Sequence, residues 1–288
     1  MRYCHAVLNS TPIEGSIFVP TLHIIILALV QGVTEFLPIS SSGHLVLVPY
    51  FGGWQDQGLV LDVAVHVGTL GAVAAYLWRD LADMISGLWR MLKGKGVNDA
   101  VRLAFYLVLG TLPVIAAGFA MNRYYPDGIR SITVIGWTTL GFGVLLWLMD
   151  RFGVTIRKMQ HLKLFDVLVI GFAQCLALIP GTSRSGITMT AGRLLGMERA
   201  DCARFSMLLS IPTIVGAGVL KGYDLYKAGD AVQIDTALTA AAFAFVSALI
   251  AIALMMTWLK HASFTPFVIY RVVLGGFLLA VSYGYVVF

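Results

Sequence analysis

The sequence predicts an all-α polytopic membrane protein, and three observations lead to that fold class. Of the 288 residues, 58% are hydrophobic and only 12% are charged, whereas a soluble domain carries about 25% charged residues. Apolar stretches of roughly 20 residues, the length that a transmembrane helix needs, recur along the chain. Lysine and arginine gather in a few loops between these stretches, as the positive-inside rule describes for cytoplasmic loops.

Six apolar stretches are long enough to be full transmembrane helices: about 59–79, 101–121, 131–150, 201–221, 237–259 and 266–286. Two further apolar segments, 21–52 and 164–196, are interrupted by Pro, Gly and Ser, and their halves are too short to cross a bilayer. They are predicted to be re-entrant helix–loop–helix hairpins, because non-helical backbone at membrane depth must be buried in protein or face a watery cavity. Residues 1–20 lack the pattern of a signal peptide and are predicted to be an N-terminal extension.

The loop charges orient the predicted helices. The loops 79–102 and 150–163 are rich in lysine and arginine and are predicted to be cytoplasmic. The loops 122–130 and 222–236 are less basic and are predicted to lie outside. The first hairpin therefore begins and ends outside, and the second begins and ends inside.

The two interrupted segments are also related in sequence. QGVTEFLPISSSG, which begins at Gln31, aligns with QCLALIPGTSRSG, which begins at Gln174, and Gln, two Ser and Gly coincide. Each half of the chain holds one hairpin and three spans, so the second copy is inverted. We expect a single membrane domain, 21–288, made of repeat 1 (about 21–150) and repeat 2 (about 164–288), with the two hairpins meeting near the bilayer midplane.

Three ionisable residues lie within the interrupted segments: Glu35, His44 and Arg184. Such residues are costly in a membrane and are candidates for function. Gln31 and Glu35 are four residues apart and share one helix face. Each hairpin turn is rich in Ser and Gly, so its hydroxyl and N–H groups can bind an anion. In the second turn the planar fork of Arg184 suits phosphate.

Together these residues form an inventory for phosphoryl transfer on a lipid phosphate. The predicted catalytic residues are Glu35, Ser41, His44 and Arg184. Ser41 is the preferred nucleophile, with His44 as its base or as an acid for the leaving group, but attack by water or by His44 itself stays open. The predicted substrate-binding residues are Gln31, Ser40, Ser42, Gln174, Gly181, Ser183 and Ser185.

The segments QGVTEFLPISSSGH and QCLALIPGTSRSG resemble the two signature motifs of the undecaprenyl-diphosphatase (bacitracin-resistance) family, and LDVAVHVGT and FTPFVIYR extend the likeness over nearly the whole chain from about residue 21. The resemblance implies hydrolysis of undecaprenyl diphosphate to the monophosphate and inorganic phosphate at the outer face of the bacterial cytoplasmic membrane. This reaction recycles the cell-wall lipid carrier and confers bacitracin resistance. The resemblance also implies a divalent cation, Mg²⁺ or Ca²⁺, with Glu35 as a candidate ligand. Many members carry Glu at the position of Gln31, so this site has one carboxylate fewer.

Two other functions compete with this interpretation. A polyprenyl-phosphate flippase or anion transporter would share the inverted repeats and hairpins, but it needs no nucleophile, His and Glu around an arginine. A second lipid-phosphatase family also has Ser-Gly-His, but its downstream Arg is followed by His and Asp, whereas Ser-Gly-Ile-Thr-Met-Thr follows Arg184 here.

The remaining polar residues give weaker signals. Asp62 and His66 share a helix face but are too few to define a metal site, and three scattered cysteines form neither a disulfide framework nor a zinc motif. Arg193, Arg204 and Arg271 are interpreted as snorkelling or headgroup-contacting residues. The net charge of +5 comes from membrane-flanking loops, so membrane lipids and a lipid substrate are the expected partners, with no nucleic acid. A homodimer is compatible with the sequence, which does not fix the oligomeric state.

Overall fold

The structure is a computed structural model that describes residues 21–54, 58–124, 131–228 and 234–286. The predicted N-terminal extension, 1–20, and parts of both predicted outside loops, 125–130 and 229–233, lie outside the described residues. The helices are α1 (Thr21–Phe36), α2 (Ser41–Gly52), α3 (Gly58–Tyr76), α4 (Trp78–Leu92), α5 (Asp99–Tyr124), α6 (Ile132–Phe152), α7 (Leu164–Gln174), α8 (Arg184–Leu194), α9 (Arg199–Ala228), α10 (Ile234–Leu259) and α11 (Thr265–Ser282), with short 3₁₀ helices η1 (Met159–His161) and η2 (Cys175–Leu178).

Five of these helices, α5, α6, α9, α10 and α11, are each long and apolar enough to cross a membrane. A sixth span is obtained when α3 and α4 are taken together, although the pair bends by 78° at the break between them. All of the regular elements in the described ranges are helical apart from one isolated bridge between Arg157 and Met197. The predicted all-α, polytopic class is therefore confirmed.

Helix α4 corrects one detail of the prediction, because it occupies most of the segment expected to be the loop 79–102. Met84 and Gly87 are buried on one face, whereas Ile85 and Trp89 are exposed on another. Apolar residues at three- and four-residue spacing on a chain that also carries charges are the signal of an amphipathic helix. The helical spacing is present in the sequence, but the charged residues of this segment favoured the prediction of a loop.

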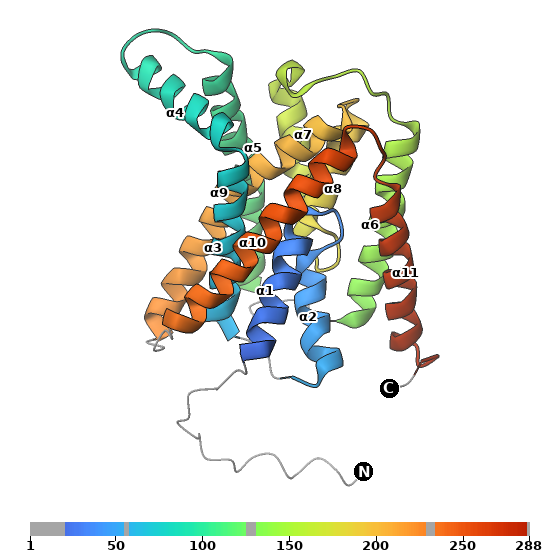
Figure 1. The fold of residues 1–288 in the computed structure, drawn as a ribbon. Helices are drawn as coiled ribbons and strands as arrows, with labels where there is room; N and C mark the ends of the chain where they lie inside the picture. Colours follow the sequence, from blue (N-terminus) through green and yellow to red (C-terminus); the bar gives the residue numbers. More distant parts are fainter. Residues whose placement is uncertain (1–20, 55–57, 125–130, 229–233, 287–288) are drawn as a thin grey trace.

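The two interrupted segments fold as hairpins that enter the bundle from opposite ends (Figure 1). Helix α1 rises from the end opposite α4, and the chain returns as α2 after the turn 37–40. Helix α7 descends from the opposite end, continues as η2 and returns as α8. Both hairpins therefore place their turns inside the bundle, as the inverted-repeat prediction requires.

The helix contacts are paired in the same inverted way. Helix α10 packs along α1 and α3, and its repeat counterpart α5 packs along α7 and α9. Close approach is possible because small residues lie at these crossings: a Cβ added to Gly32 would lie 2.6 Å from the Ala244 carbonyl oxygen, and one added to Gly171 would lie 2.6 Å from that of Gly110. The contacts hold each hairpin against its neighbours at a fixed depth.

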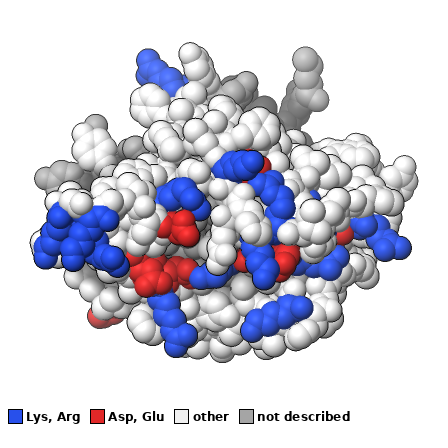
Figure 2. Space-filling model, turned by 90° about the horizontal axis from the view of Figure 1, so that it is seen from above, with Lys and Arg blue, Asp and Glu red and all other residues white. Residues whose placement is uncertain are grey.

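Charged side chains cover the end of the bundle that carries α4 and the loop after α6 (Figure 2). Several of them are paired there. Asp150 accepts from Arg193 Nε at 3.0 Å and from Arg199 Nε at 2.7 Å, and Arg204 pairs with Asp80. The snorkelling interpretation is wrong for Arg193 and Arg271, because both are fully buried, and Arg204 is held in an ion pair.

Candidate active site

The two hairpin turns have the same local structure at Ser40 and Ser183, the serines that the sequence repeat aligns. Both residues have positive φ, 78° at Ser40 and 71° at Ser183, a conformation that few non-glycine residues adopt. Each Oγ accepts a hydrogen bond from the N–H three residues later, Gly43 N at 3.3 Å and Gly186 N at 3.1 Å. These bonds cap the N-termini of α2 and α8. The serine side chains predicted to bind substrate therefore shape the turns.

Arg271 of α11 fixes both turns in place. Its guanidinium donates to Pro38 O in the first turn at 3.3 Å, and to Gly181 O and Thr182 O in the second at 3.0 and 2.9 Å. Two further bonds reach the carbonyl oxygens of α6 at Thr138 and Thr139. A buried arginine with its donors spread over backbone carbonyls satisfies groups that would otherwise be orphaned at membrane depth. This structural role was missed in the sequence because the partners are main-chain atoms.

Glu35 is the centre of the polar cluster that the hairpins build. Its Oε2 accepts from Gln31 Nε2 at 2.8 Å and from Ser41 Oγ at 2.6 Å, while its Oε1 accepts from Arg184 Nη2 at 2.7 Å. The carboxylate is buried, and Arg184 is largely buried. The structure thus brings together four of the predicted residues, Gln31, Glu35, Ser41 and Arg184. Arg184 Nη1 has no hydrogen-bond partner among the described residues, which leaves one donor of the fork free for an anion.

A cavity of about 420 Å³ opens beside this cluster. Glu35 and Arg184 contribute to its polar end, together with Asp62 and His66 of α3. Apart from Thr213, the remaining walls are apolar, and they come mostly from α3 and α9: Val63, Val67, Leu70, Ile214, Val215 and Val219. A pocket with a few convergent polar groups and apolar walls suits a ligand that has a charged head and a hydrocarbon chain.

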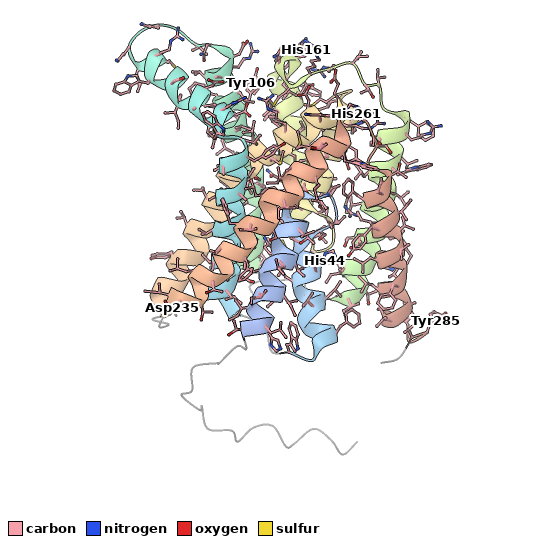
Figure 3. The ribbon with its side chains drawn as sticks, viewed as in Figure 1. His44, Tyr106, His161, Asp235, His261 and Tyr285 are labelled. Atoms are coloured by element: carbon pink, nitrogen blue, oxygen red, sulfur yellow. The ribbon has the colours of Figure 1, made fainter. Side chains whose placement is uncertain are left out.

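His44 lies at mid-depth, between the end marked by His161 and His261 and the end marked by Asp235 and Tyr285 (Figure 3). Both of its ring nitrogens have partners. Nδ1 is 2.7 Å from Ser40 O, so it carries the proton and donates, and Nε2 is 2.5 Å from the Tyr270 hydroxyl, which then donates to it. His44 is therefore tied to the first turn and to α11, and it does not line the 420 Å³ cavity.

His66 is the residue that the sequence analysis undervalued. It lines the cavity, and its Nε2 lies 4.0 Å from Glu35 Oε2. Its Nδ1 is 2.7 Å from Asp62 O one turn earlier, which fixes the ring and assigns the proton to Nδ1 in the neutral form. The available signal was an ionisable residue inside an apolar span. From the sequence, His66 and Asp62 were interpreted as a metal pair or as residues that support the site from behind.

The other predicted substrate-binding residues lie around the cluster and not in the cavity. Ser42 is exposed, and Ser185 Oγ donates to Leu37 O, which links the second hairpin to the first. Gln174, the repeat partner of Gln31, is bonded to α5 and α9 through Gly110 O and Thr213 Oγ1. Gly181 has φ of 89° and touches α6.

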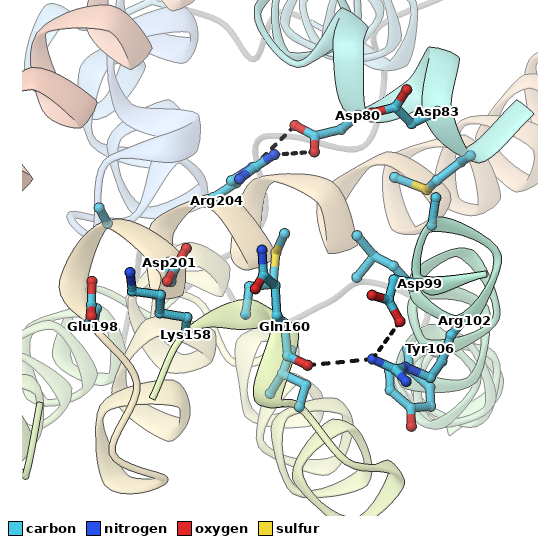
Figure 4. Close-up of a pocket in the computed structure, with 16 residues that line it drawn as sticks. Asp80, Asp83, Asp99, Arg102, Tyr106, Lys158, Gln160, Glu198, Asp201 and Arg204 are labelled. Atoms are coloured by element: carbon cyan, nitrogen blue, oxygen red, sulfur yellow. Dashed lines mark hydrogen bonds and ion pairs between the residues drawn. The ribbon is translucent and has the colours of Figure 1, made fainter. Parts of the chain in front are cut away.

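A second cavity of about 500 Å³ lies at the charged end of the molecule, beneath α4 (Figure 4). Two of its acidic residues pair with basic neighbours: Asp80 with Arg204, and Asp99 with Arg102, which also donates to Gln160 O. The first ion pair connects α4 to α9, whereas the second lies within α5, which the bond to Gln160 O links to η1. This cavity holds none of the predicted site residues.

The donor set does not fit a cation held by the protein alone. Both oxygens of Glu35 already accept hydrogen bonds, and no group of three or more His, Cys, Asp or Glu side chains in the described part of the chain is placed to hold a metal ion. Gln31 Oε1 is buried without a partner, so one neutral oxygen is available. Mg²⁺ in proteins is often held by one or two carboxylates plus substrate phosphates. The cation therefore stays a prediction. A cation that arrives bound to a diphosphate suits these residues better than a cation held by the protein alone.

The fold and the site define a class: a polytopic membrane protein whose two re-entrant hairpins hold an arginine, a carboxylate and a serine hydroxyl beside an apolar-walled cavity. Residues 24–277 match the family model described as bacitracin resistance protein BacA, and the chain belongs to that family. The chain is 53% identical over 269 residues to undecaprenyl-diphosphatase 1 of Rhodospirillum rubrum, an alignment that covers 91% of this chain and 95% of that protein. It is 54% identical over 263 residues to the undecaprenyl-diphosphatase of Ruegeria pomeroyi, covering 91% and 98%.

Proposed function

We propose that this chain hydrolyses undecaprenyl diphosphate to undecaprenyl phosphate and inorganic phosphate, and so recycles the lipid carrier of cell-wall polymers and confers bacitracin resistance. The family membership and the relatives named undecaprenyl-diphosphatase support the reaction. The single observation that carries it in this molecule is that Glu35 bonds both Arg184 and Ser41 beside a cavity with mostly apolar walls.

The bonds around Glu35 support a two-step route. Ser41 donates its hydroxyl proton to Glu35 and attacks the terminal phosphorus, and the bond to the bridging oxygen breaks so that undecaprenyl phosphate leaves. Water then attacks the phosphoserine, phosphate leaves, and Glu35 returns its proton to Ser41. Arg184 binds the phosphoryl oxygens through Nη1 and holds Glu35 through Nη2. Positioning and charge stabilisation of this kind supply most of the rate in phosphoryl transfer.

The apolar walls support a lipid substrate. Half-exposed and exposed valines of α3 and α9 line the cavity next to the polar cluster, where the first isoprene units of the substrate would lie. A soluble diphosphate would gain nothing from these walls. Each buried CH₂ group contributes about 0.8 kcal/mol to binding, so the long chain anchors the head at the cluster.

The loop charges support an orientation in the cytoplasmic membrane with the site open to the outside. The basic loops lie at the end that carries α4. The cavity is lined by residues 62–70 in the middle of α3 and by residues 213–219 in the second half of α9, the half that leads away from that end. Cysteines introduced at Val67 and Val219, labelled by an impermeant thiol reagent in whole cells, test this orientation. A homodimer stays a prediction, which the mass of the detergent-solubilised protein tests.

The function is tested by phosphate release from undecaprenyl diphosphate with purified protein in detergent. Wild type is compared with Arg184→Ala, and both are run with and without a chelator. Turnover that is lost in the variant, while its melting temperature is kept, supports the reaction and the role of the arginine. A chelator effect on wild type adds the cation. Folded wild-type protein that shows no turnover with cation and long-chain substrate would contradict the proposal and favour a transport function.

A further inference from the structure

We infer that His66 is a catalytic residue of this site: the general base that takes a proton from the water that hydrolyses the phosphoserine. The inference rests on the proposed function and assigns a role to a residue outside both hairpins. His44, predicted as the base for Ser41 or as the acid for the leaving group, stays a prediction.

Position is the first argument. His66 lines the same 420 Å³ cavity as Glu35 and Arg184, and its Nε2 lies 4.0 Å from Glu35 Oε2. Ser41 Oγ approaches that same oxygen at 2.6 Å from α2. The serine and the histidine therefore flank one carboxylate oxygen, the serine from the hairpin and the histidine from the cavity side. A water molecule between the phosphoserine and His66 would have the histidine as its acceptor.

The second argument is the state of the ring. Nδ1 is bonded to Asp62 O at 2.7 Å, so the neutral ring carries its proton on Nδ1 and presents the Nε2 lone pair to the cavity. His44 has the same arrangement on Nδ1, but its Nε2 already accepts from Tyr270 at 2.5 Å. Of these two histidines, only His66 has an Nε2 that faces Glu35 and accepts no hydrogen bond from another side chain.

The third argument is the proton balance. In the first step the proton of Ser41 moves to Glu35, which then cannot act as a base for water. In the second step water attacks phosphorus, its proton moves to Nε2 of His66, the bond from phosphorus to Oγ breaks, and Glu35 protonates Oγ. His66 then releases its proton to solvent through the cavity. The charged groups that face His66 are Glu35 from α1, Arg184 from α8 and Asp62 on its own helix; the part of α9 that lines the cavity contributes no charged side chain.

The test uses the purified full chain in detergent with undecaprenyl diphosphate labelled in its terminal phosphate. His66→Ala and His66→Gln are compared with wild type, and His261→Gln, an exposed residue at the charged end, serves as the matched control. A positioned base contributes about 10²–10⁴-fold to a rate, so kcat falls by at least about 100-fold in both His66 variants, and KM falls with it because hydrolysis of the phosphoserine becomes the slow step. Free imidazole restores turnover to His66→Ala. Labelled phosphoprotein accumulates in His66→Ala and is absent from His66→Ala/Ser41→Ala.

Three outcomes would overturn the inference. His66→Gln with wild-type kcat would remove any need for a proton acceptor at this position. A loss in His66→Ala that imidazole does not restore, in a protein with wild-type melting temperature, would assign His66 a packing role. Rapid turnover without accumulated phosphoprotein in His66→Ala would place the base elsewhere. In each case wild-type phosphate release still reports on the proposed function, so the two failures are distinguishable.

Discussion

Arg184 Nη2 and Glu35 Oε1 lie 2.7 Å apart, and this ion pair joins two hairpins that enter the bundle from opposite ends. Glu35 ends the first half of one hairpin, and Arg184 begins the second half of the other. The two sequence repeats therefore supply different halves of one site: repeat 1 contributes the carboxylate and the serine hydroxyl, and repeat 2 contributes the guanidinium. Neither repeat contains a complete set, which explains why the repeated motifs differ at these positions.

The Arg184 fork leads to a first prediction, for Arg184→Lys. A lysine keeps the charge, but it cannot donate to Glu35 and to a phosphate oxygen in fixed directions at the same time. We expect kcat/KM for undecaprenyl diphosphate to fall about 100-fold, or roughly 2.7 kcal/mol of transition-state stabilisation. Phosphate release measures this, with Arg90→Lys on the exposed face of α4 as the control. Wild-type kcat/KM in Arg184→Lys would show that a point charge is sufficient.

Gly181 gives a second prediction, about the second hairpin turn. Its φ is 89°, and an added Cβ would lie 2.2 Å from Thr138 Oγ1 and 2.7 Å from Ile135 O of α6. Side chains are strained in this conformation, and the backbone of α6 cannot move away cheaply. We expect Gly181→Ala to reduce stability by about 2–4 kcal/mol, which a lower melting temperature in detergent reports.

The matched control for Gly181→Ala is Gly141→Ala, because a Cβ at Gly141 would meet nothing within 4 Å and its helical backbone is ordinary. That change is expected to leave the melting temperature unchanged or raise it slightly, since alanine favours a helix over glycine. Equal melting temperatures for the two variants would contradict the close approach of the turn to α6.

A third prediction concerns Arg271, whose side chain is fully buried and donates to both turns. Arg271→Leu would orphan several buried carbonyl oxygens, each at a cost of about 1–3 kcal/mol. We expect a loss of at least about 3 kcal/mol of stability and the loss of phosphate release, because the turns no longer hold Glu35 and Arg184 together. Arg79→Leu on α4, an exposed arginine, is the control. A stable, active Arg271→Leu protein would mean that the helices alone position the turns.

Much of this fold could be predicted from the sequence because membrane helices are long and apolar, and because interrupted apolar segments are rare. The positions of α5, α6, α10 and α11 agree with the predicted spans to within four residues, and α9 continues seven residues beyond its predicted end. Helix α4 was missed because it carries several charged residues between its apolar ones. These charges indicated a loop, although the apolar residues have a helical spacing. The domain and repeat boundaries stay predictions.

The candidate site was predicted in part. Gln31, Glu35, Ser41 and Arg184 were expected to meet because ionisable residues within a membrane segment need partners, and the structure brings them together. The roles of His66 and Arg271 could not be read in advance, because each depends on contacts between helices far apart in sequence. The sequence around a histidine within an apolar span, or around an arginine near the end of a span, does not indicate whether the side chain faces lipid or the site.

The last prediction concerns cation dependence and the substitution Gln31→Glu. Gln31 Nε2 now donates to Glu35 Oε2 at 2.8 Å, so a carboxylate at residue 31 replaces a hydrogen bond with repulsion between two buried acids. A divalent cation would relieve this repulsion and gain a second acidic ligand. We expect the variant to bind Mg²⁺ more tightly than wild type in the absence of substrate, seen as a larger rise in melting temperature on adding Mg²⁺. Its phosphate release should also depend more steeply on Mg²⁺ concentration.

Gln174→Glu, at the repeat-related position outside the cluster, is the control for a carboxylate added to a hairpin. Identical Mg²⁺ responses in wild type and Gln31→Glu would show that Gln31 and Glu35 take no part in cation binding, and that any cation is held by the diphosphate alone.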